Sequence, residues 1–401
     1  MRLARVVPLA LAAAALIVLG TAGATSAATK TKAAGTPIVI GASIDLTKGM
    51  APFDAPALAA AKIEIAKINA AGGVDGHPLE LKYLNDQLDP TQTKEDATKL
   101  VSQGINVGWV TCDVDYATPA IQAFLAAKLL TIAPCIGTDQ MGPSRFGSAG
   151  QLAFSFGNAA QDEGAAAAEY AISRGWKTAD VVTDKLLVYF QNVCTAFTDR
   201  FKQLGGTIVD SESFTQGDKT INNVATRVNS NPAKVIAFCT SFGTDAPAFV
   251  DALRSEGNTT PIINGWASDG NYWWSKNPKI TNFYFVTFAG AVAKDPDPAV
   301  RAFEAKLKAA GSPAQTGGFI TGADAVDAIA YAIKQNGGST DGAKLAATLS
   351  HLTKFKTLGG PISFTPTLHT VTGRPYRVIE INNNVAKVLT THTTKVIPNI
   401  H

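Results

Sequence analysis

Short strands rich in β-branched residues alternate with helices along the first third of the chain. Residues 37–43 are predicted to form a buried strand, and residues 58–71 a helix that ends at Gly72-Gly73. The alternation continues through elements predicted at 79–84, 91–103, 105–110, 119–127 and 129–133. Strands joined by helices favour a parallel sheet covered by helices, so this pattern predicts an α/β fold.

The alternation starts again after residue 154. The helix, Gly-Gly and strand order of residues 58–84 recurs at 192–213. Further elements of this second half are predicted at 162–174, 178–183, 221–229, 235–239, 246–256 and 261–264. Two similar α/β halves are the simplest account of this recurrence.

The last third of the chain has too few predicted strands to form a third α/β unit. Its predicted helices are 297–310, 322–335 and 340–350, and its predicted strands are 360–364, 376–381 and 386–390. We expect these elements to complete two lobes, made of residues 37–154 plus 291–355 and residues 158–286 plus 366–395. The chain then crosses between the lobes near 154–158, 286–291 and 355–366, and such a hinge allows closure about a cleft.

The first 28 residues have the pattern of a secretory signal peptide. A positive start precedes an apolar run over residues 6–20, and Ser26-Ala27-Ala28 fits a small-residue cleavage site. A retained N-terminal anchor is the alternative, although this run is short for a spanning helix of about 20 residues. Residues 29–36 are predicted to be a flexible tail. We expect a chain exported to the periplasm, cell envelope or medium, soluble after cleavage and without a lipid-anchor cysteine.

Charge argues against nucleic acid as a partner. The chain has 35 Lys and Arg against 32 Asp and Glu, a net charge of +3 that falls to about +1 if Arg2 and Arg5 leave with the leader. Export also changes how the four cysteines are interpreted, because disulfides persist in oxidising compartments. We favour the pairs Cys112–Cys135 and Cys194–Cys239, which join neighbouring elements within one half, over four buried thiols. None has the close spacing of zinc ligands.

Motifs that carry catalytic chemistry are absent from the sequence. It contains no H-E-x-x-H, G-x-S-x-G or G-K-[ST] motif. Four of the five histidines lie within the last 51 residues without metal-ligand spacing, and His77 belongs to a predicted turn. We therefore expect no enzyme activity, no cofactor and no metal.

Candidate binding residues follow the carboxyl ends of the predicted strands, where open α/β sheets bind ligands. Aromatic side chains recur in these loops and suggest an apolar small-molecule cleft. Each aromatic residue taken alone is explained as well by ordinary packing. The candidate ligand-binding residues are Phe53, Asp115, Tyr116, Ile136, Gly137, Tyr189, Trp266 and Asp269.

The sequence resembles the type I periplasmic solute-binding proteins of ABC importers, in the branch of the leucine/isoleucine/valine-binding proteins. The stretch Ile68-Asn-Ala-Ala-Gly-Gly-Val-Asp-Gly-His-Pro-Leu-Glu-Leu81 carries most of the likeness, with Ile40-Gly-Ala, residues 85–90 and residues 253–257. The resemblance covers about residues 37–390. It implies two Rossmann-like lobes with parallel-type central sheets, a three-segment hinge and ligand capture by lobe closure. It also implies an ABC permease as partner and a monomeric chain.

The ligand loops depart from the family's pattern. Family members that bind amino acids hold the carboxylate with Ser and Thr hydroxyls, but here the two loops contain Asp113-Val114-Asp115-Tyr116 and Ile136-Gly137-Thr138. The family's acidic anchor for the ammonium group corresponds to Trp266. We therefore expect an aromatic, amide-like or cationic ligand, with Asp113 or Asp115 accepting a hydrogen bond or positive charge. The alternatives are a sensory protein that signals to a membrane receptor and an exported hydrolase.

Overall fold

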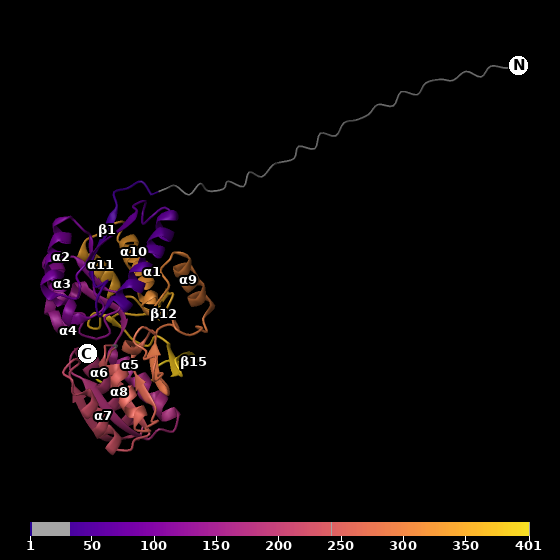
Figure 1. The fold of residues 1–401 in the computed structure, drawn as a ribbon. Coiled ribbons are helices and arrows are strands. Elements are labelled where there is room, and N and C mark those ends of the chain that lie inside the picture. Colours follow the sequence, from indigo (N-terminus) through magenta and orange to yellow (C-terminus); the bar gives the residue numbers. More distant parts are fainter. Residues whose placement is uncertain (2–32, 242, 401) are drawn as a thin grey trace.

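The structure is a computed structural model that describes residue 1, residues 33–241 and residues 243–400 (Figure 1). Two α/β lobes lie one above the other in the view of Figure 1, each built on its own central sheet. The predicted leader over residues 1–28, apart from Met1, and the first part of the predicted tail lie outside the described residues.

The sheet of the first lobe is parallel throughout, with the order β13-β5-β4-β3-β1-β2. Its strands are β1 (Ile38–Ile44), β2 (Leu79–Asn85), β3 (Val107–Val110), β4 (Leu130–Ala133), β5 (Ala153–Asn158) and β13 (Thr370–Val371). Strands β1, β3, β4 and β5 are almost wholly buried, as expected of a parallel sheet covered on both faces.

Helices from both ends of the chain cover this first sheet. They are α1 (Ala51–Ala70), α2 (Pro90–Ser102), α3 (Val114–Ala126), α4 (Pro143–Phe146), η1 (Gly147–Leu152), α9 (Pro298–Ala309), α10 (Gly318–Gln335) and α11 (Gly342–Leu349). The late helices α10 and α11 lie beside the indigo elements of the N-terminal segment in Figure 1. Helix α10 packs tightly on α1, because a Cβ at Gly322 would lie 2.1 Å from the Ala57 carbonyl oxygen.

The second lobe has a mixed sheet with the order β15-β14-β10-β9-β8-β6-β7. Its strands are β6 (Thr178–Asp184), β7 (Thr207–Phe214), β8 (Val235–Cys239), β9 (Ile262–Asn264), β10 (Phe283–Thr287), β14 (Tyr376–Asn382) and β15 (Val385–His392). Strands β6 to β10 are parallel, as predicted, but β14 and β15 are antiparallel. Asn383 and Asn384 both have positive φ, which is the geometry of a two-residue hairpin turn.

The remaining elements complete the second lobe and the connection between the lobes. Helices α5 (Ala160–Ser173), α6 (Val188–Gln203), α7 (Ile221–Ser230) and α8 (Asp245–Ser255) pack in the pairs α5–α6 and α7–α8. The short turn η2 (Trp266–Ser268) follows β9, and β11 (Phe355–Thr357) and β12 (Gly360–Ile362) form a separate two-stranded sheet. Strands β5 and β10 were not predicted from the sequence.

The sheet pairings indicate where the chain passes between the lobes. Strand β5 belongs to the first sheet up to Asn158, and β13 pairs with β5 before β14 joins the second sheet. The lobe boundaries stay a proposal, and we place the first crossing just after Asn158 and the third between Val371 and Tyr376. The third crossing lies beyond the predicted range of 355–366 because β13 returns to the first sheet.

Three helices that carry candidate binding residues begin earlier than the sequence pattern indicates. Helix α1 begins at residue 51 instead of 58, α3 at 114 instead of 119, and α6 at 188 instead of 192. Proline is favoured in the first turn of a helix, so Pro52 in α1 marks a start and not an interruption. The extensions place Phe53, Tyr116 and Tyr189 in first helical turns and not in loops.

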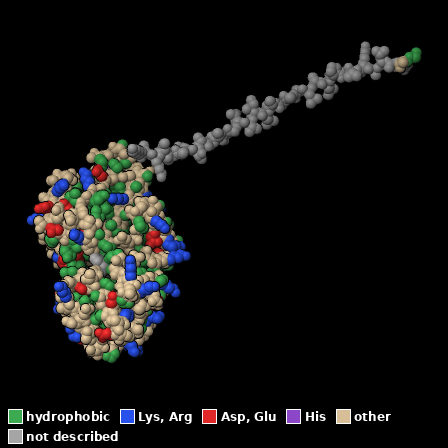
Figure 2. Space-filling view, viewed as in Figure 1, with side chains coloured by type: hydrophobic (Ala, Val, Ile, Leu, Met, Phe, Trp, Pro, Cys, Tyr) green, Lys and Arg blue, Asp and Glu red, His purple; other side chains and the backbone are tan. Residues whose placement is uncertain are grey.

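Both predicted disulfides are confirmed: Cys112 is bonded to Cys135, and Cys194 to Cys239. Within the described ranges, no helix combines the length and the apolar character needed to cross a bilayer. On the face shown in Figure 2, Lys and Arg side chains are interspersed with Asp and Glu over both lobes.

Candidate functional site

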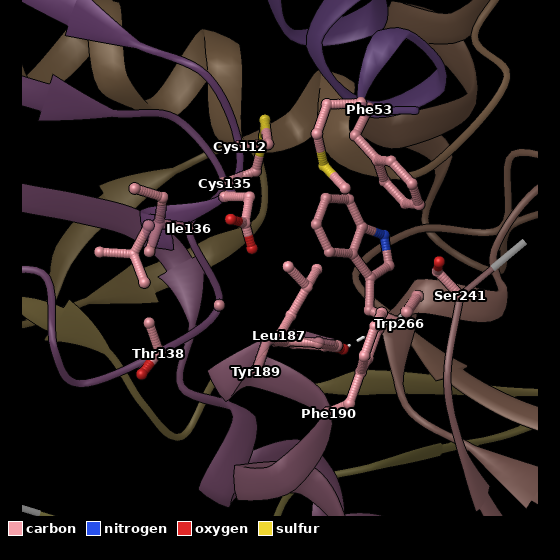
Figure 3. Close-up of a pocket in the computed structure, with 15 residues that line it drawn as sticks. Phe53, Cys112, Cys135, Ile136, Thr138, Leu187, Tyr189, Phe190, Ser241 and Trp266 are labelled. Carbon is pink, nitrogen blue, oxygen red and sulfur yellow. Dashed lines mark hydrogen bonds between the residues drawn. A yellow bond between two sulfur atoms is a disulfide. The ribbon is translucent and has the colours of Figure 1, made fainter. Parts of the chain in front are cut away.

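A narrow pocket lies between the two lobes, at the carboxyl ends of the first-lobe strands (Figure 3). Its cavity volume is about 30 Å³, so the two lobes as arranged leave room for about two water molecules. The first lobe contributes Met50, Phe53, Cys112, Asp113, Val114, Cys135, Ile136, Gly137 and Thr138. The second lobe contributes Leu187, Tyr189, Phe190, Ser241, Trp266 and Ala267. The side chains around this space are predominantly apolar and aromatic.

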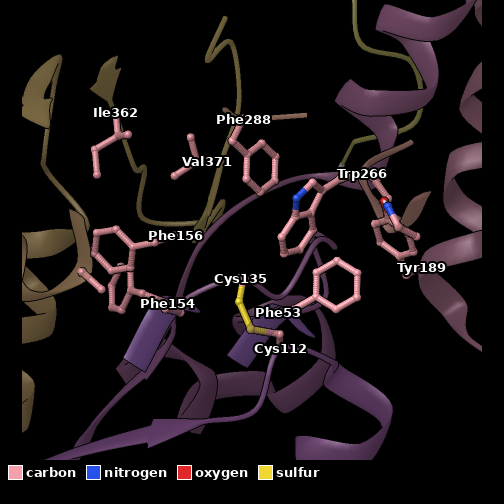
Figure 4. Close-up of a cluster of buried hydrophobic side chains, with 14 of the residues drawn as sticks. Phe53, Cys112, Cys135, Phe154, Phe156, Tyr189, Trp266, Phe288, Ile362 and Val371 are labelled. Carbon is pink, nitrogen blue, oxygen red and sulfur yellow. A yellow bond between two sulfur atoms is a disulfide. The ribbon is translucent and has the colours of Figure 1, made fainter. Parts of the chain in front are cut away.

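Trp266 is the centre of an aromatic cluster that joins the lobes (Figure 4). Its ring meets the ring of Phe53 edge to face, with centroids 4.6 Å apart. The ring of Phe288 stacks on it at 4.7 Å. Phe53 belongs to the first lobe and Trp266 to the second, so this pair forms a contact across the pocket. Aromatic pairs of this kind contribute about 0.5–1.5 kcal/mol beyond the burial of their area.

Asp269 fixes the indole of Trp266 through a hydrogen bond, but Asp269 does not itself line the pocket. The Trp266 Nε1–H donates to Asp269 Oδ2 at 3.2 Å, and the Thr287 hydroxyl and the Gly317 N–H donate to the same oxygen. Burial raises the pKa of Asp269 to about 6. Asp269 was predicted to bind ligand directly, but the structure places it at the Nε1 edge of the Trp266 ring and outside the pocket lining, with both of its oxygens accepting from protein donors.

Glu163 supports the same wall, and sequence reasoning missed it. Its Oε2 accepts hydrogen bonds from the Tyr189 hydroxyl and from the Trp266 N–H, the latter at 2.8 Å. The Ala267 N–H donates to the Tyr189 hydroxyl oxygen at 3.3 Å. Burial raises the pKa of Glu163 to about 8, so this carboxyl group is mostly protonated at neutral pH. The only signal in the sequence is an acid in the first turn of an alanine-rich helix, α5.

Asp115 and Tyr116 do not line the pocket, although both were predicted to bind ligand. Asp115 Oδ2 accepts a hydrogen bond from the Val188 N–H at 3.0 Å, and Asp115 Oδ1 pairs with Arg145 at 2.9 Å. Val188 begins α6 in the second lobe, so Asp115 links the lobes beside the pocket. The extension of α3 turns Asp115 and Tyr116 away from the cavity and leaves Asp113 at its wall.

Asp113 is the only carboxyl group among the residues that the structure places around the pocket. Its Oδ1 caps α3 by accepting from the N–H groups of Asp115 and Tyr116, at 2.9 and 3.0 Å. Burial raises the pKa of Asp113 to about 7. The described lining residues include no Lys, Arg or His. The pocket therefore offers a hydrogen-bonding carboxyl group but no cationic side chain to a ligand.

Gly137 allows the lobes to meet closely at the edge of the pocket. A Cβ at Gly137 would lie 2.7 Å from Cε2 of Tyr189, so the absence of a side chain lets the tyrosine ring rest on this loop. Next to it, Asn192 Nδ2 of the second lobe donates to the Thr138 hydroxyl at 3.1 Å. The structure thus brings Phe53, Ile136, Gly137, Tyr189 and Trp266 of the predicted set together around one cavity.

Asp54, Cys112 and Cys135 place three potential ligand atoms within 4.8 Å of one another. The two sulfurs are bonded to each other, so neither is available as the thiolate that metal binding needs. Asp54 accepts hydrogen bonds from Thr111, the Cys112 N–H and the Asp45 N–H. These three residues form no metal centre in their present state.

The fold and the pocket between its two lobes define a solute-binding protein of the type I architecture. The sequence matches the periplasmic binding protein family over residues 37–386, and the chain belongs to this family. A Leu/Ile/Val-binding protein homologue of Brucella melitensis is 26% identical over 334 residues, covering 82% of this chain and 88% of that protein.

Solved structures share the fold at lower identity. A branched-chain amino acid transporter substrate-binding protein of Streptococcus pneumoniae, in complex with isoleucine, is 19% identical with a TM-score of 0.75 and covers 89% of this chain and 99% of its own. A solute-binding protein of an ABC transporter from Rhodopseudomonas palustris, in complex with p-hydroxybenzoic acid, is 15% identical with a TM-score of 0.77, covering 91% and 99%. Proteins of this fold thus hold both aliphatic and aromatic ligands.

Proposed function

We propose that this chain is an exported solute-binding protein that captures a small neutral or cationic aromatic molecule between its lobes and delivers it to an ABC permease. The observation that carries the proposal is the narrow pocket between Trp266, Phe53 and Tyr189, whose lining includes one carboxyl group and no described cationic side chain. The relatives support transport, since they are named as Leu/Ile/Val-binding proteins and as transporter components.

The pocket chemistry separates this ligand from amino acids and benzoates. An α-ammonium group needs an acidic partner on the second-lobe wall, where Trp266 stands. A ligand carboxylate needs hydrogen-bond donors or a cationic side chain. In this pocket it would instead lie near the carboxyl group of Asp113. When the lobes part to admit a ligand, a planar ring would stack on the aromatic walls, and an amide or ammonium substituent would donate to Asp113. Phe53, Ile136, Gly137, Tyr189 and Trp266 contact the ligand in this proposal.

We also propose how the protein is exported and how its two lobes close over the ligand. The leader over residues 1–28 directs export, and the mature chain acts as a monomer without cofactor or metal. The lobes 37–154 plus 291–355 and 158–286 plus 366–395 close over the ligand, with the crossings adjusted as described above. Asp115 and Arg145 stabilise the closed lobes from the rim, because Asp115 reaches the Val188 N–H of the other lobe.

A thermal-shift panel tests the ligand class. The purified protein is melted with benzamide, benzylamine, benzyl alcohol, benzoate and leucine, each over a concentration series. A ligand at 100 times its Kd adds about 2.7 kcal/mol to the free energy of unfolding. We expect stabilisation by one or more of the first three compounds, and none of it in Trp266→Ala. Stabilisation by leucine or benzoate alone contradicts the proposed ligand class.

A further inference from the structure

One disulfide of this protein is part of the pocket wall. Cys112 comes directly after β3 and Cys135 shortly after β4, and these strands are neighbours in the first sheet. Both cysteines line the cavity, with Cα atoms 4.7 Å apart. Figure 4 shows their disulfide facing the rings of Phe53 and Trp266. The bond is therefore next to the space that a ligand ring would occupy.

The other disulfide has a different setting. Cys194 lies on α6 and Cys239 at the end of β8, so this bond joins two elements inside the second lobe. Their side chains are 2% and 1% exposed, and neither residue is among those that line the pocket. A reductant reaches this bond only if the second lobe itself opens. The Cys112–Cys135 bond, in contrast, faces a space that lies between two lobes.

The pocket disulfide also sets the spacing of the two first-lobe loops. The segment after Cys112 carries Asp113, and the segment after Cys135 carries Ile136, Gly137 and Thr138. A disulfide holds its sulfurs about 2.05 Å apart, a separation that two thiols cannot adopt without overlap. If the bond is broken, the two sulfurs move apart, either by rotation of a cysteine side chain or by a shift of a strand end, and either movement changes the shape of a pocket this narrow.

We propose that the Cys112–Cys135 disulfide is a reducible wall of the ligand pocket, so that its reduction weakens ligand binding while the two-lobe fold persists. The inference rests on the proposed function for the opening of the lobes and for the class of ligand. The reductant is a dithiol. One of its thiolates attacks a sulfur of the disulfide and forms a mixed disulfide with that cysteine, releasing the other cysteine. Its second thiol then attacks the mixed disulfide and releases the first cysteine. Two electrons and two protons pass to the protein, which leaves two protein thiols and an oxidised dithiol.

Linkage makes the effect reciprocal. If the oxidised pocket binds a ligand more tightly than the reduced pocket, the ligand stabilises the oxidised form by the same factor. Closed lobes also shield the bond, because Cys112 is 7% exposed and Cys135 fully buried in the present arrangement. We therefore expect a bound ligand to slow reduction of this disulfide and to leave Cys194–Cys239 unaffected.

The first arm of the test needs no ligand. The purified protein is incubated with dithiothreitol without denaturant, alkylated at intervals, and mapped by peptide mass spectrometry, while circular dichroism follows the fold. We expect Cys112–Cys135 to be reduced at least tenfold faster than Cys194–Cys239, with unchanged secondary structure. Equal rates, or reduction that occurs only together with unfolding, overturn the inference.

The second arm measures binding with benzamide as the probe. The double variant Cys112→Ala/Cys135→Ala is compared with the matched control Cys194→Ala/Cys239→Ala, and thermal melting confirms that both are folded. We expect Kd to rise at least tenfold in the first variant and less than twofold in the control. Unchanged binding in the first variant overturns the inference and leaves the proposed function intact. If benzamide does not bind the wild type, benzylamine or benzyl alcohol serves as the probe; if none of the three binds, the proposed ligand class is wrong, and the reduction rates alone decide this inference.

Discussion

The backbone N–H of Trp266 donates to the carboxyl group of Glu163, 2.8 Å away, although the two residues are 103 positions apart in the chain. The Tyr189 hydroxyl donates to the same oxygen. One buried acid thus fixes two of the three described second-lobe aromatic residues that line the pocket, Tyr189 and Trp266. Glu163 positions these two residues and does not itself line the cavity.

The titration of Glu163 predicts that stability falls as pH rises. Burial raises the pKa of Glu163 from an ordinary value of 4.5 to about 8 in the folded protein. Between these values the unfolded chain has released a proton that the folded chain still holds. The stabilising contribution is therefore complete below about pH 4.5 and is lost as the pH approaches 8, by at most about 1.4 kcal/mol per pH unit.

Glu163→Gln removes this dependence, because glutamine keeps an acceptor oxygen for the Trp266 N–H and does not titrate. Urea unfolding at pH 5, 6, 7 and 8 measures the free energy of unfolding for wild type and variant. We expect the difference between them to change with pH, and the exposed control Glu95→Gln to follow the wild type. Parallel curves for wild type and Glu163→Gln contradict this assignment.

Trp266→Ala tests the aromatic wall. Truncation of a buried Trp costs about 3–5 kcal/mol of stability, and here it also removes the ring contacts to Phe53 and Phe288. We expect the affinity for an aromatic ligand to fall at least tenfold, and Trp266→Phe to recover much of it. Trp273→Phe is the matched control, since Trp273 is buried in the second lobe away from the pocket. Calorimetric titration separates loss of affinity from loss of stability.

Asp115→Ala tests the contact between the lobes. The side chains of Asp115 and Arg145 are 34% and 26% exposed, so their ion pair adds at most about 1 kcal/mol to stability. Asp115 also accepts the Val188 N–H of the other lobe, and this bond exists only while the lobes are together. We expect ligand affinity to fall several-fold with little change in melting temperature. Glu212→Gln, which breaks an exposed pair within the second lobe, is expected to leave affinity unchanged.

Asp324→Ala tests the buried pair that anchors the third crossing. Asp324 on α10 pairs with Arg374 at 2.8 Å, both side chains are fully buried, and Arg374 also donates to the Phe156 carbonyl oxygen. Removal of one partner leaves an uncompensated buried charge, which costs about 3–5 kcal/mol. Urea unfolding measures the loss. A loss below 1 kcal/mol, similar to that of an exposed pair, would show that the pair does not anchor this segment.

The α/β alternation and the disulfides were predictable because they depend on local pattern and compartment. The starts of α1 and α3 were not, since Pro52 in the first turn and the Asp113 cap resemble loop residues in the sequence, and the start of α6 has no capping side chain to mark it. This error placed Asp115 and Tyr116 at the ligand. Phe53, Tyr189 and Trp266 of the predicted set lie around one pocket, and aromatic residues near strand ends have a position that is recognisable in the sequence.

Glu163 and Phe288 escaped sequence reasoning for a different reason. Their roles arise from contacts between segments more than twenty residues apart, such as Glu163 with Trp266 and Phe288 with Trp266. No local pattern distinguishes these residues from other helix and strand-end residues. Their placement depends on how α5 and the segment after β10 pack against the η2 turn that carries Trp266.

In the proposed function, the pocket selects an uncharged or cationic aromatic ligand over an anionic or aliphatic one. Isothermal titration of the purified protein at pH 7 with benzamide, benzoate and leucine tests it most directly, because benzamide and benzoate share a ring and differ mainly in charge. We expect one benzamide site per chain, and we expect benzamide to bind at least tenfold more tightly than benzoate or leucine. Tighter binding of benzoate or leucine would contradict the proposed selectivity.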